Sequence, residues 1–597
     1  MNDPAARHQA LVLLQNELGR FVIEEHALQR DSLRRLWASP VEDRVTEGRC
    51  IADLTVVAQP TPGHWVLHCE GNDSRFREGD LVRLSRGDPQ LPFIEASILA
   101  AGDTRIEVLA WRTYGETACA VGQSGICADE SFIDLEARYL AAIDDLGKTD
   151  VGREIVLPLL GGDLGVSVDA ATFDDVSAQP EFEQLNDRQQ EAAANAIASD
   201  TCWLIQGPPG TGKTHVLAWI IDDLLRQNQR VFVTSFTHRA INNLLAAVAE
   251  RVTEPGRIAK IAAFTDPTFP VAIEQRERFS ELTLAKQHDG CGYVIGATPF
   301  ALRSSRLGQR DFDTIVIDEA SQVTVPLAVM AMLAGRKYIF AGDHQQLPPV
   351  TLSRSAIEAR SLSIFGRLVG RGHDTLLTTT HRFGDALCAW PSDTFYQSRL
   401  RSHPRVANRL LHLALSPRGD QVWHAALAAE PACVWLAVPH RGCRSYAPEE
   451  TTLLVELLRA LHAGGLDWED IGVVVPFRRQ ARFLRRRLAA KSPDHAPPAA
   501  LVIDTVERMQ GQEREVVCVS FTTSDPDFAH RLREFLLLPQ RLNVAATRPR
   551  SKLILLASPE LLDYARSSPD DDLCAAFVSL LASAHRIDIP LPEQSPP

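Results

Sequence analysis

The spacing of apolar residues divides the chain into an N-terminal part and a longer part with a different pattern. Residues 9–37 carry leucine, phenylalanine and isoleucine at helical spacing among charged residues, which predicts a helix with one buried face. From residue 49 to residue 111 the pattern changes to short alternating segments separated by Gly, Pro and Asp, which predicts a small β-barrel. Residues 130–145 again have helical spacing, so we expect the barrel to be carried on a helical stalk. The predicted barrel strands include 65–68, 80–84 and 105–110.

After residue 185, apolar strands alternate with helical patterns, an order typical of parallel α/β domains. The first set of predicted strands is 202–206, 231–235, 313–318 and 337–343. The second set is 433–438, 471–476, 516–521 and 552–557. We therefore expect two α/β domains in tandem, with a proline-rich loop at 492–499 and a loose proline-rich tail at 591–597.

Length and composition fit an ordinary globular protein. The 597 residues are 45% hydrophobic and sufficient for several domains. The N-terminus lacks the layout of a signal peptide and the chain has no long apolar span, so we expect a cytoplasmic protein without membrane contact. Eleven cysteines without a CxxC pair argue against a zinc ribbon or an iron–sulfur cluster and for reduced thiols.

The formal net charge of −14 disfavours general attraction to nucleic acid. Any such contact must therefore be local. The segment 471–491 contains no acid and crowds basic residues onto one predicted helix. That helix is a candidate for phosphate contacts, and a solvated arginine face is the equal alternative. Its basic residues are Arg478, Arg479, Arg482, Arg485, Arg486, Arg487 and Lys491.

A glycine-rich octapeptide stands between the first predicted strand and an amphipathic helix. In such a loop the glycines let backbone N–H groups face phosphate oxygens, a lysine reaches the β and γ phosphates, and a hydroxyl binds Mg²⁺. Lys213 and Thr214 are the residues of those two types. The pattern predicts a nucleoside triphosphate site whose residues are Gly207, Pro208, Pro209, Gly210, Thr211, Gly212, Lys213 and Thr214.

Polar residues follow two further strands of the same predicted domain. Asp318 and Glu319 come directly after the strand 313–318, at the sheet edge where the phosphate loop is also expected. Asp318 is the candidate Mg²⁺ ligand, and Glu319 the candidate base for the water that attacks the γ phosphate. Gln346, in the loop after the next strand, is a candidate sensor of the γ phosphate, with a solvated turn residue as the alternative.

These segments in this order resemble superfamily 1 helicases, and among them the 1B branch that contains the nonsense-mediated-decay helicase and the immunoglobulin mu-binding helicase. The resemblance covers residues 185–560 and begins with Leu185-Asn186-Asp187-Arg188-Gln189, similar to the family's Q motif. It implies two RecA-like P-loop domains, and it implies that Gln189 recognises adenine, so that ATP is the nucleotide. The predicted division is a stalk and barrel at 1–180, RecA-like domains at 181–368 and 369–570, and a helix with a proline-rich tail at 571–597.

The resemblance continues through the second half of the chain. Thr380-His381-Arg382-Phe383 is similar to a motif whose arginine is an arginine finger, although His381 stands where a tyrosine is usual. In Arg541-Leu542-Asn543-Val544-Ala545-Ala546-Thr547-Arg548, similar to motif VI, Arg548 matches the second finger. The segment 504–513 resembles motif V, from which we expect Gln510 and Glu513 to contact the nucleotide.

The same resemblance implies a path for nucleic acid. Segments 234–242 and 297–299 are similar to motifs Ia and Ic, and 475–480 to the proline-tyrosine motif. From the residues alone, Thr237, His238 and Thr298 are equally well interpreted as helix caps. The implied nucleic-acid contacts are Thr237, His238, Thr298, Arg478 and Thr505.

The expected function is that of an ATP-dependent translocase and helicase on single-stranded DNA or RNA, with ATP and Mg²⁺ as cofactors and 5′ to 3′ polarity implied by the resemblance. Closure of the two domains would bring both arginines to the γ phosphate and couple hydrolysis to stepping. The main rival is a nucleic-acid-gated ATPase switch without strand separation. A P-loop kinase or transport ATPase is a more distant rival. We expect a monomer, with protein partners contacted through the N-terminal region.

Overall fold

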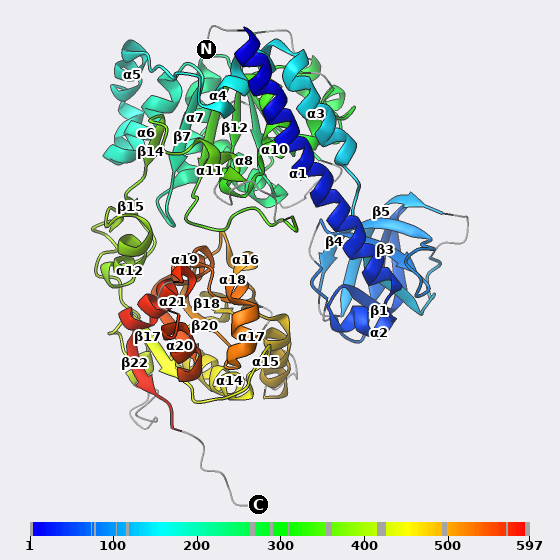
Figure 1. The fold of residues 1–597 in the computed structure, drawn as a ribbon, viewed down its shortest axis with the longest axis vertical. Helices are drawn as coiled ribbons and strands as arrows, with labels where there is room; N and C mark the ends of the chain where they lie inside the picture. Colours follow the sequence, from blue (N-terminus) through cyan, green and yellow to red (C-terminus); the bar gives the residue numbers. More distant parts are fainter. Residues whose placement is uncertain are drawn as a thin grey trace, which may run out of the picture. The chain divides into compact units, whose positions relative to one another are not determined.

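A computed structural model gives the fold of this chain (Figure 1). The structure describes residues 4–72, 74–76, 79–102, 104–114, 119–252, 254, 256–262, 269–286, 290–308, 310–353, 361–414, 425–491, 498, 500–568 and 571–590. The chain divides into two compact units. One contains residues 16–141 together with 351–353, and the other contains the remaining described residues.

The first of these units is built on a closed antiparallel barrel, drawn in blue in Figure 1. Its strand order is β1-β2-β5-β4-β3-β6. Side chains at alternate positions of each strand point to the same face, and Ile94, Ala96 and Ile98 of β4 are all fully buried in the barrel core. The strands are β1 (Cys50–Thr61), β2 (His64–His68), β3 (Leu81–Ser85), β4 (Ile94–Ala101), β5 (Arg105–Thr113) and β6 (Ile126–Glu130).

Three helices flank the barrel in sequence, namely α1 (Pro4–Ala38), α2 (Val41–Thr46) and α3 (Glu136–Lys148). Within the barrel unit, Arg30 of α1 pairs with Asp134 at 2.9 Å and with Glu136 at 2.6 Å. The expected helix at 130–145 begins only at Glu136, because Glu130 is still paired with Val82 as the last residue of strand β6. The predicted helical part and small barrel are confirmed.

The first α/β sheet has eight strands in the order β10-β9-β11-β8-β12-β13-β7-β14. All of its strand pairs are parallel. The strands are β7 (Cys202–Gln206), β8 (Arg230–Thr234), β9 (Ile258–Ile261), β10 (Ile273–Arg276), β11 (Tyr293–Gly296), β12 (Phe312–Ile317), β13 (Gly335–Gly342) and β14 (Asp374–Leu376).

Helices cover the sheet because its central strands are apolar on both faces. Every residue of β7 is buried, and Ile205 packs with residues of α6, α7 and α8 in one core cluster. The helices of this part are α4 (Leu157–Gly161), α5 (Ala170–Ser177), α6 (Asp187–Ala198), α7 (Lys213–Arg226), α8 (His238–Ala249), α9 (Pro299–Leu302), α10 (Val325–Met332) and α11 (Ile364–Leu368).

The second α/β sheet has six strands in the order β19-β18-β20-β21-β17-β22, again with parallel pairs. The strands are β17 (Cys433–Ala437), β18 (Ile471–Val474), β19 (Val502–Asp504), β20 (Arg514–Ser520), β21 (Pro549–Ala557) and β22 (His585–Asp588). A two-stranded parallel ladder of β15 (Thr379–Thr380) and β16 (Arg401–Ser402) lies between the two sheets in sequence.

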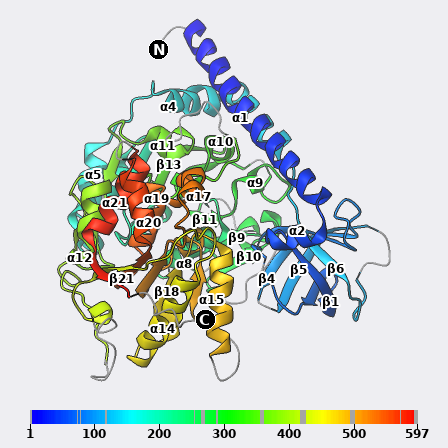
Figure 2. The same ribbon diagram turned by 60° about the horizontal axis from the view of Figure 1, so that its bottom comes forward.

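Alternation along β17 assigns the helices of this part to two faces. Val434 and Leu436 belong to the cluster that contains α14 and α15, which lie side by side in both views (Figures 1 and 2). Trp435 and Ala437 belong to the cluster that contains α19, α20 and α21. The helices are α12 (Asp385–Phe395), α14 (Pro448–Ala463), α15 (Arg478–Ala490), α16 (Val506–Met509), α17 (Pro526–Arg531), α18 (Arg533–Leu536), α19 (Pro539–Ala546), α20 (Pro559–Arg566) and α21 (Asp572–Ser583).

The expected fold class, two RecA-like α/β domains with a helical part and a small barrel, is confirmed. The division by residue number stays a prediction, and the sheets differ from it at two points. Residues 374–376, which the prediction assigned to the second domain without a strand, form β14 and pair with β7 of the first sheet. Residues 585–588, which the prediction assigned to a C-terminal helix and tail outside the domain, form strand β22 and pair with β17. The predicted tail at 591–597 and nearly all of the predicted loop at 492–499 lie outside the described residues.

No described helix combines the length and the apolar character that crossing a membrane requires. All eleven cysteines are free thiols, and most of them are buried.

Candidate functional site

The loop that follows β7 turns tightly and enters helix α7. Gly210 and Gly212 have φ angles of 74° and 83°, which residues with a side chain rarely adopt. A Cβ added to Gly207 would lie 2.0 Å from the Cγ of Lys213, so the lysine side chain packs directly on the loop. Its Nζ donates to the carbonyl oxygen of Gly207 at 2.5 Å. Glycine is therefore required for both the turn and the close approach of Lys213.

The polar groups of the remaining loop residues form hydrogen bonds within the protein or lie at the start of α7. Thr211 donates through Oγ1 to the carbonyl of Pro208 at 2.8 Å, and the carbonyl of Pro209 accepts from Thr380 Oγ1 at 2.9 Å. Thr214 is half-buried in the first turn of α7, where the N–H groups have no partner within the helix. A helix start of this kind favours an anion.

Gln189 lies beside this loop, as the resemblance implies. It is buried in the first turn of α6 and forms a capping box with Asn186. Its Nε2 donates to the carbonyl of Thr211 at 3.0 Å, and its Oε1 accepts from the N–H of Asn186 at 3.1 Å. The Nε2 end of the amide thus holds the phosphate loop, the Oε1 end completes the capping box of α6, and adenine recognition by Gln189 stays a prediction.

The two carboxylates after β12 lie in different environments. Asp318 is buried, and its Oδ1 accepts from the N–H of Glu319 at 2.8 Å. Burial, and then the nearby Glu319, raise the pKa of Asp318 to about 7, while the charge of Lys213 opposes the shift. Glu319 has a φ of 51°, a conformation that costs free energy for a residue with a side chain. Its Oε2 accepts from the amide of Gln510 at 3.4 Å.

The oxygen donors at this edge suit a hard cation such as Mg²⁺. Asp318 supplies a carboxylate next to the phosphate loop, and Thr214 supplies a hydroxyl. Ser321 adds a buried hydroxyl that has no hydrogen-bond partner among the described residues. A divalent cation would favour the charged form of Asp318 and so offset the effect of burial. The predicted metal ligands therefore fit the ion chemically.

The loop after β13 is organised by Asp343. Its carboxylate accepts from the amides of Gln206 at 3.3 Å and Gln346 at 2.8 Å, and from the hydroxyl of Tyr396 at 2.7 Å. Asn543 of α19 donates to the same hydroxyl oxygen at 2.9 Å. The amide of Gln346 is thus directed at Asp343, and its role as a γ-phosphate sensor stays a prediction. Asp343 joins the first α/β domain to the second.

A pair of arginines from the second α/β domain shares one carboxylate. Arg382 donates through Nε to Glu513 at 2.7 Å and through Nη1 to the carbonyl of Thr547 at 2.9 Å. Arg550 binds the other oxygen of Glu513 at 2.6 Å. Burial by itself raises the pKa of Glu513, but the two arginines outweigh it and the pKa lies below its usual value. The structure thus places Glu513 as the partner of Arg382, and a ribose contact stays a prediction.

Arg548 is buried and has no carboxylate partner in the part of the chain that the structure describes. Among the described residues, its guanidinium donates to the carbonyls of Val544 at 2.8 Å and Gln512 at 3.3 Å and to the hydroxyl of Thr547 at 3.3 Å. Burial, and then the charge of Arg382, lower the pKa of Arg548 to about 9. Its position follows from the topology, because Arg548 and Glu513 precede the adjacent parallel strands β21 and β20.

The segment that carries Arg382 contacts the phosphate loop, and Arg548 lies near the acidic pair. The N–H of His381 donates to the carbonyl of Gly210 at 2.8 Å. A Cβ added to Gly210 would lie 2.5 Å from the Cβ of Arg382. Glu319 of the first domain is also close enough to act on the pKa of Arg548. The predicted phosphate loop, carboxylates and arginines therefore gather at one place. His381 itself stacks on the ring of His403, with 4.6 Å between centroids.

The predicted nucleic-acid residues all follow the carboxyl ends of strands. Thr237 comes after β8 and accepts the N–H of Ala240 at 3.2 Å, which is the alternative helix-cap role. Thr298 and Thr505 precede α9 and α16 without a side-chain cap bond. His238 is exposed, and Arg478 is half-exposed at the start of α15. In the first sheet, β11 and β8 are neighbours, on the side away from the phosphate loop of β7.

The sequence analysis assigned neither Asp343 nor its partners Tyr396 and Asn543 to the site. Tyr396 and Asn543 are both buried, and both belong to the contact between the two α/β domains. Burial, and then Asp343, raise the pKa of Tyr396 well above its usual value. Asn543 lies within the segment that resembles motif VI, which offered a signal. Tyr396 stands in an ordinary apolar helix end and offered none.

The fold and the site together define a P-loop nucleoside triphosphatase with two RecA-like domains. A phosphate loop follows β7, an acidic pair follows β12, and helices cover the faces of two parallel sheets. Comparison with known protein families agrees with this class. Two family models, each described as an AAA domain, match residues 189–352 and 360–560.

Curated relatives place the chain more narrowly. The bovine DNA replication ATP-dependent helicase/nuclease DNA2 is 28% identical over 409 residues, which are 64% of this chain and 38% of that protein. The golden hamster DNA-binding protein SMUBP-2 is 29% identical over 431 residues, 62% of this chain and 42% of that protein. These matches support the resemblance to superfamily 1 helicases. The chain spans less than half the length of these relatives.

Solved structures add only a distant likeness. The arterivirus nonstructural protein 10, a helicase, is 14% identical with a TM-score of 0.38 and covers 90% of this chain and 82% of its own. The same protein in complex with DNA gives a TM-score of 0.34, with 15% identity, 77% of this chain and 71% of that chain.

Proposed function

We propose that this chain is an ATP-dependent translocase and helicase that acts on single-stranded nucleic acid, with DNA as the track and 5′ to 3′ as the direction. The proposal includes a monomeric, cytoplasmic protein whose N-terminal region contacts protein partners. The names of the relatives, a DNA replication helicase and a DNA-binding protein, support DNA over RNA.

The observation that carries the proposal is the junction between the two α/β domains. Thr380 and His381 bond directly to the carbonyls of Pro209 and Gly210, and Gln510 reaches Glu319 at 3.4 Å. A nucleotide held by the phosphate loop would therefore touch both domains at once. This arrangement supports a cycle in which ATP binding and hydrolysis change the contact between the domains.

In the proposed reaction, water attacks the γ phosphorus, its proton passes to the Glu319 carboxylate, and the bond to the ADP oxygen breaks in line. Lys213 leaves the carbonyl of Gly207 and donates to the phosphates. Asp318 and Thr214 would hold Mg²⁺, which would supply positive charge against the phosphates. The residues of the chain then position the water and the phosphate against each other.

The buried guanidinium of Arg548 supports the second half of this chemistry. A charge that is paired only with carbonyls and a hydroxyl gains strongly from an anion. Arg382 is already offset by Glu513, so its transfer to phosphate would cost an ion pair. We infer that Arg548 is the stronger of the two fingers and that Arg382 is held ready by Glu513.

The test is ATP turnover by the full chain with matched single-stranded DNA and RNA oligomers, together with strand displacement on a duplex with a 5′ overhang. We expect DNA-stimulated turnover and displacement, both lost in Glu319→Gln. Turnover with DNA but no displacement would favour the ATPase switch. Equal or greater stimulation by RNA would overturn DNA as the track, and turnover indifferent to either polymer would overturn the proposal.

A further inference from the structure

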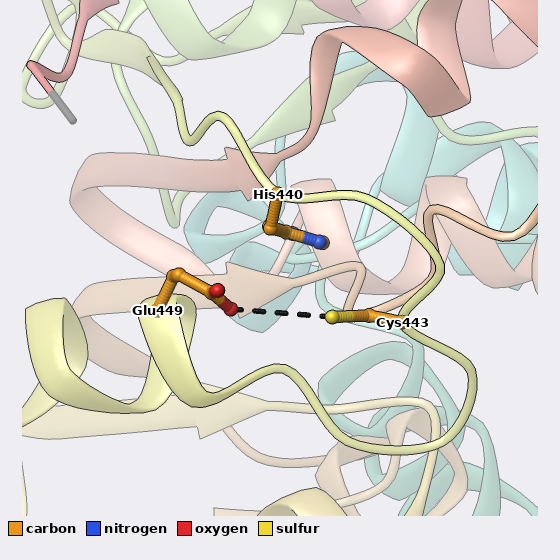
Figure 3. Close-up of side chains that lie close together, drawn as sticks. All are labelled: His440, Cys443 and Glu449. Carbon is orange, nitrogen blue, oxygen red and sulfur yellow. Dashed lines mark hydrogen bonds between the residues drawn. The ribbon is translucent and has the colours of Figure 1, made fainter. Parts of the chain in front are cut away.

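Three potential metal ligands meet in the second α/β domain, away from the nucleotide residues. His440 and Cys443 lie in the segment between β17 and α14, and Glu449 lies in the first turn of α14. Figure 3 shows the three side chains converging, with the Cys443 thiol directed at the Glu449 carboxylate. Their ligand atoms all lie within 4.8 Å of one another, and Sγ to Oε2 is 3.9 Å. Ligand atoms around a tetrahedral zinc ion are about 3.5 Å apart.

Cys443 is held in place by its backbone. Its N–H donates to Ser524 Oγ at 3.0 Å, and its carbonyl accepts from the N–H groups of Ser524 at 2.8 Å and Asp525 at 3.0 Å. The next residue, Arg444, pairs with the Asp525 carboxylate at 2.8 Å. The position of the thiol is thus fixed by the segment after β20, and does not depend on its contact with Glu449.

His440 is oriented by a carboxylate on its far nitrogen. Its Nε2 lies 2.9 Å from Oε1 of Glu450, and this carboxylate also accepts from Ser520 Oγ at 2.5 Å and from the N–H of Thr522 at 3.0 Å. An ionised carboxylate only accepts, so Nε2 carries the proton and Nδ1 of the neutral ring has the lone pair. Nδ1 now contacts Ser524 Oγ at 2.9 Å.

We propose that His440 Nδ1, Cys443 Sγ and the Glu449 carboxylate form a binding site for a zinc-class divalent cation, with water as the fourth ligand. Nitrogen, sulfur and oxygen donors in one tetrahedral set suit Zn²⁺ or Co²⁺. A carboxylate on the other nitrogen of a ligating histidine is the usual outer partner in such sites, and Glu450 has that place. The absence of CxxC pairs excludes a ribbon and leaves this mixed site open.

The exposure of the site to solvent and the small rearrangement that binding requires also favour the site. Cys443 and Glu449 are half-exposed, while His440 and Glu450 are buried, so an ion can enter from solvent onto an oriented histidine. Binding requires only that Nδ1 exchange the Ser524 hydroxyl for the ion and that the thiol lose its proton. The ion would tie the segment after β17 to the start of α14. This proposal does not depend on the ATPase activity.

The test uses the full chain stripped of metal with a chelator and titrated with Co²⁺. A cobalt–thiolate bond gives a charge-transfer absorption in the near ultraviolet, which bonds to nitrogen or oxygen alone do not give. We expect this absorption to saturate at one equivalent and to disappear when Zn²⁺ is added. We also expect Zn²⁺ to raise the melting temperature, because an ion that binds the folded state stabilises it.

Two variants and two matched controls make the test specific. Cys443→Ser should abolish the absorption and the zinc-dependent melting shift, and Glu449→Gln should weaken Co²⁺ binding by about 10- to 100-fold. Cys291→Ser removes an exposed thiol elsewhere, and Glu456→Gln removes an exposed carboxylate of the same helix; both should behave as the parent chain. No absorption in the parent chain, or an unchanged absorption in Cys443→Ser, would refute the site.

Discussion

The two α/β domains share one architecture but present the side chains of the nucleotide site from opposite ends of their strands. In the first domain, the phosphate loop, Asp318 and Asp343 follow the carboxyl ends of β7, β12 and β13. In the second domain, Glu513 and Arg548 precede the amino ends of β20 and β21. One domain therefore offers backbone N–H groups and carboxylates, and the other offers guanidinium groups.

Burial affects the two halves in opposite directions. It raises the pKa of Asp318 to about 7 and lowers the pKa of Arg548 to about 9, because a low-dielectric environment disfavours the charged form of either group. Among the described residues, neither the Asp318 carboxylate nor the Arg548 guanidinium is thus in full contact with a group of opposite charge that would offset its burial. A ligand that brings a divalent cation and an anionic phosphate would offset both, which is the composition of Mg-ATP.

The largest expected effect on ATP turnover comes from replacing Arg548, whose charge is less offset by neighbouring carboxylates than that of Arg382. Arg548→Ala should lower the kcat of ATP turnover by about 10³- to 10⁵-fold, as for other arginine fingers. Arg548→Lys keeps a charge without the planar fork and should recover only a small part. Single-turnover hydrolysis measures the effect, with the exposed Arg531→Ala as control. A folded Arg548→Ala chain with full turnover would contradict the role.

Removing the proposed base should have the next largest effect. Glu319→Gln keeps the size of the side chain and its contact with Gln510 but cannot accept the proton. We expect turnover to fall by about 10²- to 10⁴-fold, while binding of a fluorescent ATP analogue is retained. Glu183→Gln, an exposed position, is the matched control. Loss of binding together with turnover would mean that Glu319 acts on the fold of the site.

The connection between the two domains can be broken at a single oxygen. Tyr396→Phe removes the hydroxyl that donates to Asp343 and accepts from Asn543, so two buried polar groups each lose a partner. We expect the free energy of unfolding to fall by about 1–3 kcal/mol, measured by urea denaturation. Tyr564→Phe, whose hydroxyl has a contact with His530 at 3.4 Å, should change it much less. Equal losses of unfolding free energy in the two variants would show that the hydrogen bond between Tyr396 and Asp343 contributes no more stability than the contact of Tyr564.

Magnesium-dependent nucleotide binding should depend on pH through Asp318. The group is protonated below its pKa of about 7, and a neutral carboxyl is a poor Mg²⁺ ligand. Affinity for Mg-ADP should therefore be constant above this pH and fall by about tenfold for each pH unit below it. Calorimetric titrations at pH 8 and pH 6 measure the change. Asp318→Asn should remove the difference, and a wild-type affinity that is flat over this range would contradict the assignment.

The smallest expected effect distinguishes two roles of Thr237, that of a helix cap and that of a nucleic-acid contact. Its hydroxyl caps α8, so Thr237→Ala should lower the free energy of unfolding by about 1 kcal/mol, and Thr237→Ser should restore it. If Thr237 also contacts nucleic acid, Thr237→Ala should weaken binding of a single-stranded oligomer, and Thr237→Ser should not. Unchanged oligomer affinity in Thr237→Ala would leave the cap as its role.

Local patterns in the sequence were enough for the architecture. Contiguous residues form the phosphate loop, the acidic pair and each of the barrel strands. Their order or their apolar periodicity therefore indicates the backbone conformation directly. Every strand expected in the α/β part was found within a few residues. The membership of β14 in the first sheet could not be read in this way, because it depends on which distant strand offers a free edge.

What the sequence determined by itself is therefore the central strands of both sheets and the residues of the phosphate loop, since both arise from neighbours along the chain. Tertiary structure alone decided the partners. Glu513 binds Arg382 across 131 positions, Tyr396 binds Asp343 across 53, and Asn543 reaches Tyr396 across 147. Such pairings are selected by the order of strands in a sheet and by the cost of leaving a buried charge or hydroxyl unpaired, and neither quantity is present in any short stretch of residues.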